Sequence, residues 1–371
     1  MTEFPHAMLR EIFEQPAAIR RTLNLYLRSN SFDSSAFADL SGWLNPRGEV
    51  LIAASGSSRH AGLAAEIMLE DLCGLAVDVE YASEYSCRPA ANPRNPSVLV
   101  ISQSGETSDT LAALRCAQNG GHRTLAIANV PGSTMLREAT AAMPLAAGTE
   151  VAIPATKSFT CQLAAVYLLA LYEAAALGTL KPAIIDSNIA ALQSLPETID
   201  RQLAAWRAQT ATLAGKYRDA ASFLYLGRGV HYAIAREGAL KMKESSYVQS
   251  EGYPAGELKH GPNALVSEHV PLVILATVDH NVSDSVYRYE KTLQLLDDMK
   301  QQGARMIAIA DTGDNDVRAL VEDCIAVEPL SEHLLPLAEV IPLQLFAYSM
   351  AVERGVDVDR PRNLSKAVIE S

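Results

Sequence analysis

The stretch LIAASGSSRHAGLAAEIMLEDL, residues 51–72, decides the fold because a second stretch repeats its pattern. Residues 223–244, FLYLGRGVHYAIAREGALKMKE, show the same apolar run, glycine-containing turn and helix with acids near its end. Residues 98–114, VLVISQSGETSDTLAAL, correspond in the same way to residues 272–288, LVILATVDHNVSDSVYR. Self-similarity of this kind predicts two copies of one architecture in tandem.

Short apolar runs alternate with amphipathic helices through both copies. The runs predict strands at residues 50–54, 77–81, 97–102, 124–129 and 142–145, and again at 223–226, 271–278, 306–310 and 324–327. This alternation is typical of parallel sheets covered by helices on both faces, so the predicted fold class is α/β. The pattern divides the chain into a helical leader (1–45), a first domain (46–184), a helical connector (185–215), a second domain (216–350) and a tail (351–371).

The composition bounds the class of protein and its partners. The 371 residues are 49% hydrophobic and 20% charged, as in a packed protein of about two domains. A net charge of −12 disfavours nucleic acid as a partner and means that an anionic ligand needs a preorganised local site. No apolar run approaches the ~18 residues of a membrane span, and the acidic, proline-containing N-terminus favours a cytoplasmic location. The five scattered cysteines are expected to be buried small hydrophobes rather than ligands of a metal.

A hydroxyl-rich turn, SQSGET at residues 102–107, lies between a predicted strand and a predicted helix. Ligands of an open parallel sheet bind beyond the carboxyl ends of its strands, where the first amides of a helix carry partial positive charge. Gly105 would let the backbone approach a phosphate closely. The donors expected to hold the phosphate are Ser102, Gln103, Ser104 and Thr107, with Ser57 and Ser58 of the equivalent turn after the first strand.

A plainer interpretation of these residues is that they are only helix caps and turn formers. Two such turns on successive strand ends weigh against it, although the loop is neither a Walker loop nor a GxGxxG dinucleotide motif. The second copy has Thr277-Val278-Asp279-His280 in the same place, and its carboxylate would repel an anion. The sequence therefore predicts one anion site per chain, in the first domain.

Four motifs carry a family resemblance: SQSGETSDT (102–110), EGALKMKE (237–244), GELKHGP (256–262) and PRNLSKAV (361–368). Through them the chain resembles the sugar isomerase (SIS) family, and within it the isomerase half of glucosamine-6-phosphate synthase. The resemblance runs from LREIFEQP (9–16) to the last residues. It implies two flavodoxin-like SIS domains in tandem and a sugar phosphate as the ligand.

The same resemblance assigns roles to side chains that would otherwise be ordinary surface or turn residues. It implies that Glu244 is the base that moves a proton between sugar carbons 1 and 2. It implies that His260 opens the sugar ring and is supplied by the neighbouring subunit, so that the chain is a homodimer. It implies that Lys366 contacts the reacting end of the open-chain sugar, that the backbone of Ser365 also touches substrate, and that the tail folds over the site. No cofactor or metal is needed for this acid–base chemistry.

Two departures from the synthase shape the expected function. The sequence reaches the isomerase leader directly after Met1-Thr2-Glu3, without the synthase's glutaminase domain, which leads us to expect chemistry with free ammonia. The expected activity is that of a glucosamine-6-phosphate deaminase, which converts glucosamine 6-phosphate and water to fructose 6-phosphate and ammonia. Ala155 stands where the synthase has a serine that contacts sugar hydroxyls, which leaves the exact sugar open.

Other functions stay open at this point. They are another sugar-phosphate isomerase or deglycase, a synthase that lacks the glutaminase and uses free ammonia, and a non-catalytic sugar-phosphate sensor. A sensor would need only the phosphate loop, so the presence of all three candidate catalytic residues disfavours it. The sequence assigns no role to Lys241, Lys243 and Glu257, and it leaves open the preferred epimer, the physiological direction, any effector and assembly beyond a dimer.

Overall fold

The computed structural model describes residues 4–40, 42–44, 48–88 and 95–366. The chain forms two compact units, each built around one sheet. The first-sheet unit contains Glu14–Val151, Ala155–Pro196 and Ser365–Ser371. The second-sheet unit contains Met1–Phe13, Ala152–Pro154 and Glu197–Leu364. The boundary in the predicted connector falls inside the long helix α8 (Pro182–Tyr217).

The first sheet is parallel throughout, with the strand order β4-β3-β5-β6-β7. Its strands are β3 (Glu49–Ala54), β4 (Ala76–Tyr81), β5 (Ser97–Ser102), β6 (Thr124–Ala128) and β7 (Ala141–Pro144). Its helices are α2 (Gln15–Tyr26), α3 (Gly56–Cys73), α4 (Ala82–Ser86), α5 (Ser108–Asn119), α6 (Thr134–Glu138) and α7 (Lys157–Leu177). A short hairpin of β1 (Leu27–Arg28) and β2 (Ser31–Phe32) follows α2, so the predicted helical leader is only partly helical.

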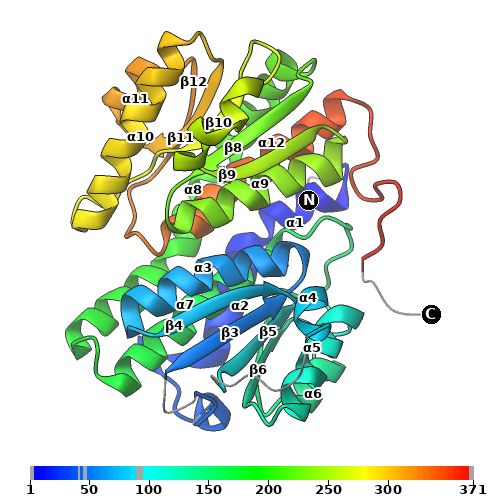
Figure 1. The fold of residues 1–371 in the computed structure, drawn as a ribbon, viewed down its shortest axis with the longest axis vertical. Helices are drawn as coiled ribbons and strands as arrows, with labels where there is room; N and C mark the ends of the chain where they lie inside the picture. The colour runs from blue at the N-terminus through cyan, green and yellow to red at the C-terminus, as the bar shows by residue number, and fades with distance from the viewer. Residues whose placement is uncertain (1–3, 41, 45–47, 89–94, 367–371) are drawn as a thin grey trace. The chain divides into compact units, whose positions relative to one another are not determined.

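Helices cover both faces of this sheet (Figure 1). Leu51, Val98 and Val100 pack with α4, α5 and α6 in one cluster. Ile52 faces the other way, against α3, where a Cβ on Gly62 would lie 2.9 Å from its Cγ2. Burial on both faces explains why the strands read as continuous apolar runs.

The second sheet has the order β12-β11-β10-β8-β9 and is also parallel. Its strands are β8 (Ser222–Gly227), β9 (Gln249–Pro254), β10 (Leu272–Leu275), β11 (Met306–Asp311) and β12 (Asp323–Val327). Its helices are α1 (Ala7–Phe13), α9 (Val230–Ser246), α10 (Ser283–Gln301), α11 (Asn315–Leu320) and α12 (Leu335–Glu353), with 3-10 turns η2 (Ala255–His260) and η3 (Pro262–Leu265).

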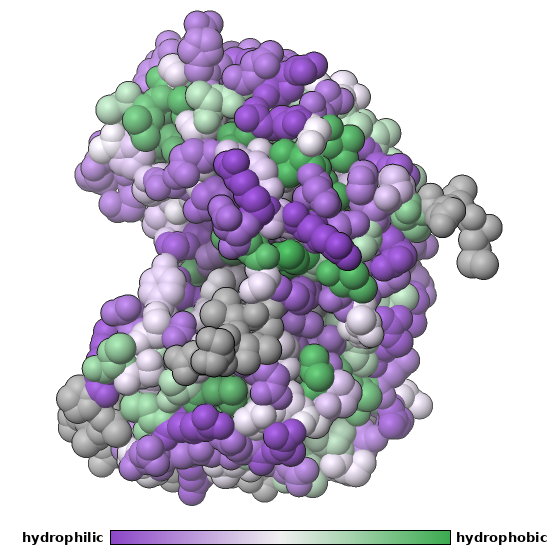
Figure 2. Space-filling model, turned by 90° about the vertical axis from the view of Figure 1, so that its right-hand side faces the viewer, coloured by the Kyte–Doolittle hydropathy of each residue, from purple (hydrophilic) through white to green (hydrophobic). Residues whose placement is uncertain are grey.

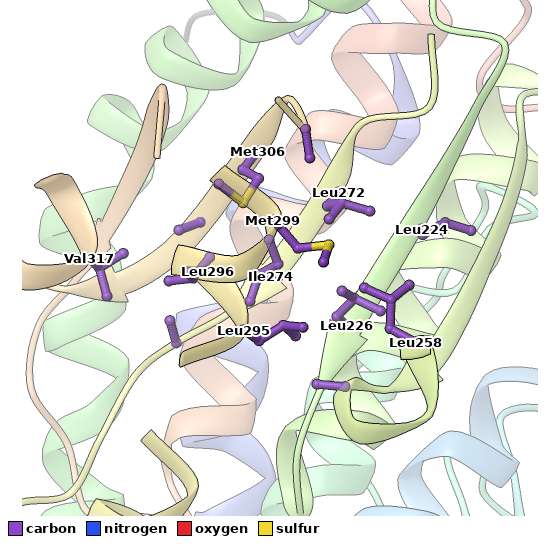
Figure 3. Close-up of a cluster of buried hydrophobic side chains, with 14 of the residues drawn as sticks. Leu224, Leu226, Leu258, Leu272, Ile274, Leu295, Leu296, Met299, Met306 and Val317 are labelled. Atoms are coloured by element: carbon purple, nitrogen blue, oxygen red, sulfur yellow. The ribbon is translucent and has the colours of Figure 1, made fainter. Parts of the chain in front are cut away.

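One core cluster of this unit joins β8, β10 and β11 to α10, as Figure 3 shows. Leu226, Ile274 and Leu296 are fully buried in it. On the other face Phe223 meets Phe346 of α12 edge to face, with ring centroids 5.6 Å apart. Both sheets thus have the strand order 2-1-3-4-5 of a flavodoxin-like doubly wound fold. The predicted α/β class, with parallel sheets flanked by helices, is confirmed.

The predicted strands all have counterparts, but β9 was not predicted. Its sequence, QSEGYP, has no apolar run, and it lies at an edge of the sheet. An edge strand has one neighbour instead of two, so backbone pairing can form it with little apolar content. The cysteine prediction needs one correction: Cys73 and Cys161 are buried, but Cys87 is exposed.

Two helices are long and apolar enough to cross a membrane by length and composition alone. They are α7 and α12, and their most apolar windows are 78% and 94% buried within the protein. Helices at the centre of an α/β core are apolar on all sides because protein surrounds them, so this is weak evidence for a membrane span. The face drawn in Figure 2 is mostly hydrophilic, with hydrophobic residues scattered over it.

Candidate functional site

A cavity of about 780 Å³ lies in the first-sheet unit. Three residues predicted for the site, Gln103, Ser104 and Lys366, contribute to its wall. The remaining lining comes from α2, from the segments that follow β6 and β7, and from β7 itself: Arg21, Leu25, Asn129, Val130, Pro131, Pro144, Leu145, Ala146, Gly148, Thr149 and Glu150. Most of these residues follow strand ends, where an open α/β sheet binds its ligands.

The candidate phosphate loop, residues 102–107, is held by hydrogen bonds among its own residues. The Ser102 hydroxyl accepts from the Gly105 N–H (3.1 Å) and lies 3.1 Å from the Thr107 hydroxyl. The Ser104 hydroxyl accepts from the Glu106 N–H at 3.1 Å, a bond typical of a turn former. Thr107 occupies the N-cap position of α5, but its side chain makes no capping hydrogen bond. The plain cap interpretation therefore fails for Thr107 and holds only in part for Ser104.

Gly105 is required by both its conformation and its neighbours. Its φ is +67°, in the left-handed region that favours glycine. A Cβ at this position would lie 2.1 Å from the Ser133 hydroxyl oxygen, so no side chain fits. The next residue, Glu106, holds the loop against α6: its carboxylate accepts a hydrogen bond from the Thr134 N–H at 2.7 Å. The loop is thus anchored against α6.

The serines of the equivalent turn lie inside a helix. Gly56 begins α3, so Ser57 and Ser58 belong to its first turn. Ser58 is buried, and its hydroxyl accepts a hydrogen bond from the Gln162 side chain of α7 at 3.0 Å. This bond gives Ser58 a structural role, and ligand binding by Ser57 and Ser58 stays a prediction.

Lys366 is held at the cavity by a carboxylate that sequence reasoning missed. Its ammonium lies 2.6 Å from Glu150, while the lysine side chain stays 26% exposed. The two residues are 216 positions apart, so no local pattern could reveal the pair. Ser365, the neighbouring residue, is exposed. Residues 367–371 of the predicted tail lie outside the described residues.

Glu150 also organises the start of α7. Its carboxylate accepts from the N–H groups of Thr156 (2.9 Å) and Ser158 (3.1 Å) and from the Ser158 hydroxyl (2.7 Å). Burial raises the pKa of Glu150, but the Lys366 charge and these hydrogen bonds outweigh burial and hold that pKa below its ordinary value. Ala155, half-buried, stands directly before this helix start.

In the second-sheet unit, α9 carries the charged row that helical spacing predicted. Lys241 is 1% exposed and lies 3.4 Å from Glu237 and 2.6 Å from Glu244. Glu237 is fully buried, whereas the Glu244 side chain is 22% exposed and can be reached. Lys243 is exposed on the same helix. Lys241 therefore positions Glu244, and Lys243 has no comparable contact with it.

His260 ends η2 and is exposed. Two neighbours fix the turn that carries it: Leu258 is fully buried in the core, and Lys259 forms an ion pair with Asp298 of α10. Gly261 follows with a φ of +142°, a conformation that favours glycine. The imidazole is thus presented outward by an anchored turn, and Glu257 on the same turn is also exposed.

Of the predicted site residues, Gln103, Ser104 and Lys366 line one cavity. Ser102 and Thr107 belong to the same loop as Gln103 and Ser104, and their hydroxyls are hydrogen-bonded to each other. Glu244 and His260 belong to the other unit. Among the described residues no group of three or more histidines, cysteines or acids is arranged to hold a metal.

Comparison with known proteins places the chain in a family. A model of the SIS domain matches residues 44–172 and 216–354, which together exceed half of the chain. The chain belongs to the SIS domain family. Each match covers one of the two sheets, so the predicted tandem of SIS domains is confirmed.

The similar curated proteins are named glutamine–fructose-6-phosphate aminotransferase (isomerizing). Those of Chlorobaculum tepidum and Thermus thermophilus are each 41% identical to this chain and match 98% of it. The chain spans 58% and 59% of the length of these two relatives.

Two solved structures are similar over nearly the whole chain. The C-terminal domain of glucosamine-fructose-6-phosphate aminotransferase from Francisella tularensis is 32% identical, with a TM-score of 0.88, 96% of this chain covered and 99% of that one. Glucosamine-6-phosphate deaminase from Thermotoga maritima shares the fold, with 21% identity, a TM-score of 0.70 and 98% and 100% of the two chains covered.

Proposed function

We propose that this SIS protein is a glucosamine-6-phosphate deaminase of the isomerising kind, an enzyme that acts in the cytoplasm. The observation that carries the proposal is the ion pair between Lys366 and Glu150 in the cavity beside Ser104. An isolated lysine in a polar segment would ordinarily be solvated. The contact of Lys366 with Glu150, in a cavity that Ser104 also lines, supports a role for this lysine at the reacting end of a bound sugar.

The candidate phosphate loop suits an anion that must leave after turnover. It offers hydroxyls from Ser102, Ser104 and Thr107, and it lies at the start of α5, whose first amides have no partners within the helix. Binding by dipoles and hydroxyls avoids a permanent salt bridge to the phosphate. Gln103 lines the same cavity and adds an amide.

The chemistry follows from the substrate. Once His260 has assisted ring opening, the sugar is an aldehyde at carbon 1 with an amine at carbon 2. Glu244, positioned by Lys241, removes the proton at carbon 2 and returns it at carbon 1. A proton also passes from the amine nitrogen to the carbon 1 oxygen, and the amino aldehyde becomes the hydroxy imine of the ketose. Water then adds to the imine carbon and ammonia leaves, so the products are fructose 6-phosphate and ammonia.

The direction is proposed from mass action. Hydrolysis of the imine uses water, which is always in excess, whereas synthesis requires that ammonia be supplied. As part of the same proposal, His260 comes from the neighbouring subunit, since it lies exposed on an anchored turn. The chain would then act as a homodimer.

A second candidate function is favoured by the 41% identity to the aminotransferases. In that case the chain would run the same isomerisation toward glucosamine 6-phosphate, with a nitrogen donor as co-substrate. The candidate catalytic residues would be the same in both directions.

The test is to incubate the protein with glucosamine 6-phosphate and to measure fructose 6-phosphate and ammonia together. Equal amounts of both products support the deaminase. Formation of neither contradicts it. Fructose 6-phosphate is then supplied with either ammonium or glutamine: use of ammonium alone fits the reversed deaminase, whereas rapid use of glutamine favours the aminotransferase.

A further inference from the structure

The carboxyl edge of the second sheet carries a buried polar cluster that the proposed function does not use. In the strand order β10 takes the place of β5, and α10 takes the place of α5. The cluster lies at the start of α10, where the first unit has its candidate phosphate loop. All members of the cluster except Arg288 are less than a tenth exposed. The cluster consists of His231, Thr277, Asp279, Ser285, Arg288, Glu332 and Glu339.

The Glu332 carboxylate is at the centre of this cluster. It accepts hydrogen bonds from the Ser285 hydroxyl and from the Arg288 guanidinium, both on the first two turns of α10. The His231 imidazole, in the first turn of α9, lies 3.6 Å away. Glu332 is 2% exposed, so these contacts replace water around it. Its own N–H donates to Asp279 (3.2 Å), which fixes the backbone of the segment that follows β12.

Two cationic side chains contact the Glu332 carboxylate, and the Asp279 and Glu339 carboxylates belong to the same cluster. Burial alone would lower the pKa of His231, but Glu339, 2.9 Å away, and Glu332 raise it to about 10. Burial would raise the pKa of Glu332, but His231, Ser285 and Arg288 lower it to about 2. An imidazolium, a guanidinium and a hydroxyl from the first turn of α10 converge on one carboxylate, and a phosphate site uses the same kinds of donor.

We propose that the Glu332 carboxylate is a built-in occupant of the anion site of the second SIS domain. It takes the position that the substrate phosphate takes in the first domain, a comparison that rests on the proposed function. The segment between β12 and α12 delivers this carboxylate, just as the segment between β7 and α7 delivers Glu150. Glu150, however, points to the start of α7 and to Lys366, which leaves the start of α5 available to a ligand.

The proposal differs from an ordinary buried ion pair in one testable respect. If Glu332 occupies an anion site, removing its side chain opens a space that free phosphate can fill. The Glu332→Ala variant should therefore unfold at a lower Tm than the wild-type chain and regain stability in phosphate. At about ten times its dissociation constant, phosphate should raise the Tm of the variant by ~3 °C or more relative to sodium chloride of equal ionic strength.

Ser104→Ala with Thr107→Ala is built into every chain tested, so that phosphate in the first domain does not contribute. The readout is stability, and it does not depend on turnover. Failure of the proposed enzyme function would leave the result unchanged. If Glu332 does not occupy an anion site, phosphate should stabilise the Glu332→Ala chain no more than the chain that retains Glu332.

Glu173→Ala is the matched control. Glu173 is a buried carboxylate, 5% exposed, whose hydrogen-bond donor is the Trp43 indole at 2.7 Å and not a cationic cluster. Its removal should lower Tm without any specific response to phosphate. An equal phosphate response in Glu173→Ala would overturn the proposal.

Glu332→Gln keeps the test valid if Glu332→Ala does not fold. The amide fills the space but leaves Arg288 without its counter-charge and His231 with Glu339 as its remaining partner. Its Tm should fall, and phosphate should stabilise it less than it stabilises Glu332→Ala. Where only the glutamine variant folds, Glu332→Ala should become soluble when refolded in phosphate and remain unfolded in chloride; no difference between the two salts would contradict the proposal.

Discussion

At the carboxyl edge of the first sheet, Gln103 and Ser104 of the hydroxyl-rich loop 102–107 border a cavity of about 780 Å³. At the same edge of the second sheet, the segment after β10 packs against the buried carboxylate of Glu332. The strand orders are the same, so topology does not account for the difference. The difference arises from a few side chains: hydroxyls and glycine at one edge, and carboxylates with their cationic partners at the other. A duplicated fold can thus keep one edge for a ligand while side chains of the chain itself fill the other.

The largest expected effect tests whether the second unit supplies chemistry. Glu244→Gln should reduce kcat about 10²- to 10⁴-fold, because an amide cannot take the proton, while the dissociation constant for glucosamine 6-phosphate changes little. Steady-state kinetics and calorimetric binding measure the two quantities. Lys243→Gln, on the exposed side of the same helix, is the control and should retain activity. If binding is lost together with turnover in Glu244→Gln, this residue holds the structure and not the reaction.

The next prediction concerns the ion pair between Lys366 and Glu150 at the edge of the first sheet. Lys366→Met should lower kcat/KM about 10²-fold and also destabilise the first-sheet unit, because it leaves the buried Glu150 carboxylate without its counter-charge. Adding Glu150→Gln should recover stability but not activity. A double-mutant cycle on Tm and on kcat/KM separates the two roles. Additive effects on Tm would show that the pair contributes no coupling.

A smaller effect is expected at the candidate phosphate loop. Ser104→Ala combined with Thr107→Ala should raise KM about 10- to 100-fold and change kcat little, since phosphate binding is the same in ground state and transition state. Ser194→Ala, an exposed serine of α8, serves as the control. An unchanged KM in the double variant would place the phosphate elsewhere and remove the contrast between the two edges.

The smallest effect is expected on the free energy of unfolding and on its pH dependence, at Asp311, the last residue of β11 in the second sheet. Asp311 is 6% exposed, and burial raises its pKa to about 6 from 3.8. The folded state therefore binds a proton more tightly than the unfolded state, so the stability from this group is present below about pH 4 and is lost as pH rises through 6. Asp311→Asn should increase the free energy of unfolding at pH 7 by on the order of 1 to 3 kcal/mol.

Denaturant unfolding at pH 4, 5, 6 and 7 checks the sign of this prediction. The gain of Asp311→Asn over the wild-type chain should grow between pH 4 and 6 and then level off. Asp316→Asn is the control, because Asp311 and Asp316 both line one cavity of about 420 Å³ but Asp316 is exposed. A constant difference at all four pH values would show that Asp311 does not titrate differently in the folded state.

Much of the fold could be predicted because the local spacing of apolar residues indicates strands and helices. Apolar runs of strand length occur where both faces of a sheet are covered. They located every strand of the two five-stranded sheets except β9, whose polar sequence pairs at an edge. The candidate phosphate loop was also readable, since its hydroxyls and glycine are adjacent in sequence. The helical face shared by Glu237, Lys241 and Glu244 followed from residue spacing alone.

Residues whose roles depend on distant partners could not be predicted in this way. Glu150 follows β7 in a segment without periodicity, and its partner Lys366 is 216 positions away. The sequence marked Asp279 as unfavourable for an anion, but it gave no sign that Glu332 lies at the same edge. The sequence also gave no sign of the hydrogen bond that the Ser58 hydroxyl accepts from Gln162, and ligand binding by Ser58 stays a prediction.

The sequence by itself determined the duplicated α/β architecture and the family, because strand and helix periodicity and short motifs are properties of neighbouring residues. Only the tertiary structure decided which carboxylate meets which cation: Glu150 with Lys366 at one edge, and Glu332 with His231 and Arg288 at the other. The physical reason is that electrostatic interactions depend on distance and burial in space. The chain brings these partners together only when both sheets have formed.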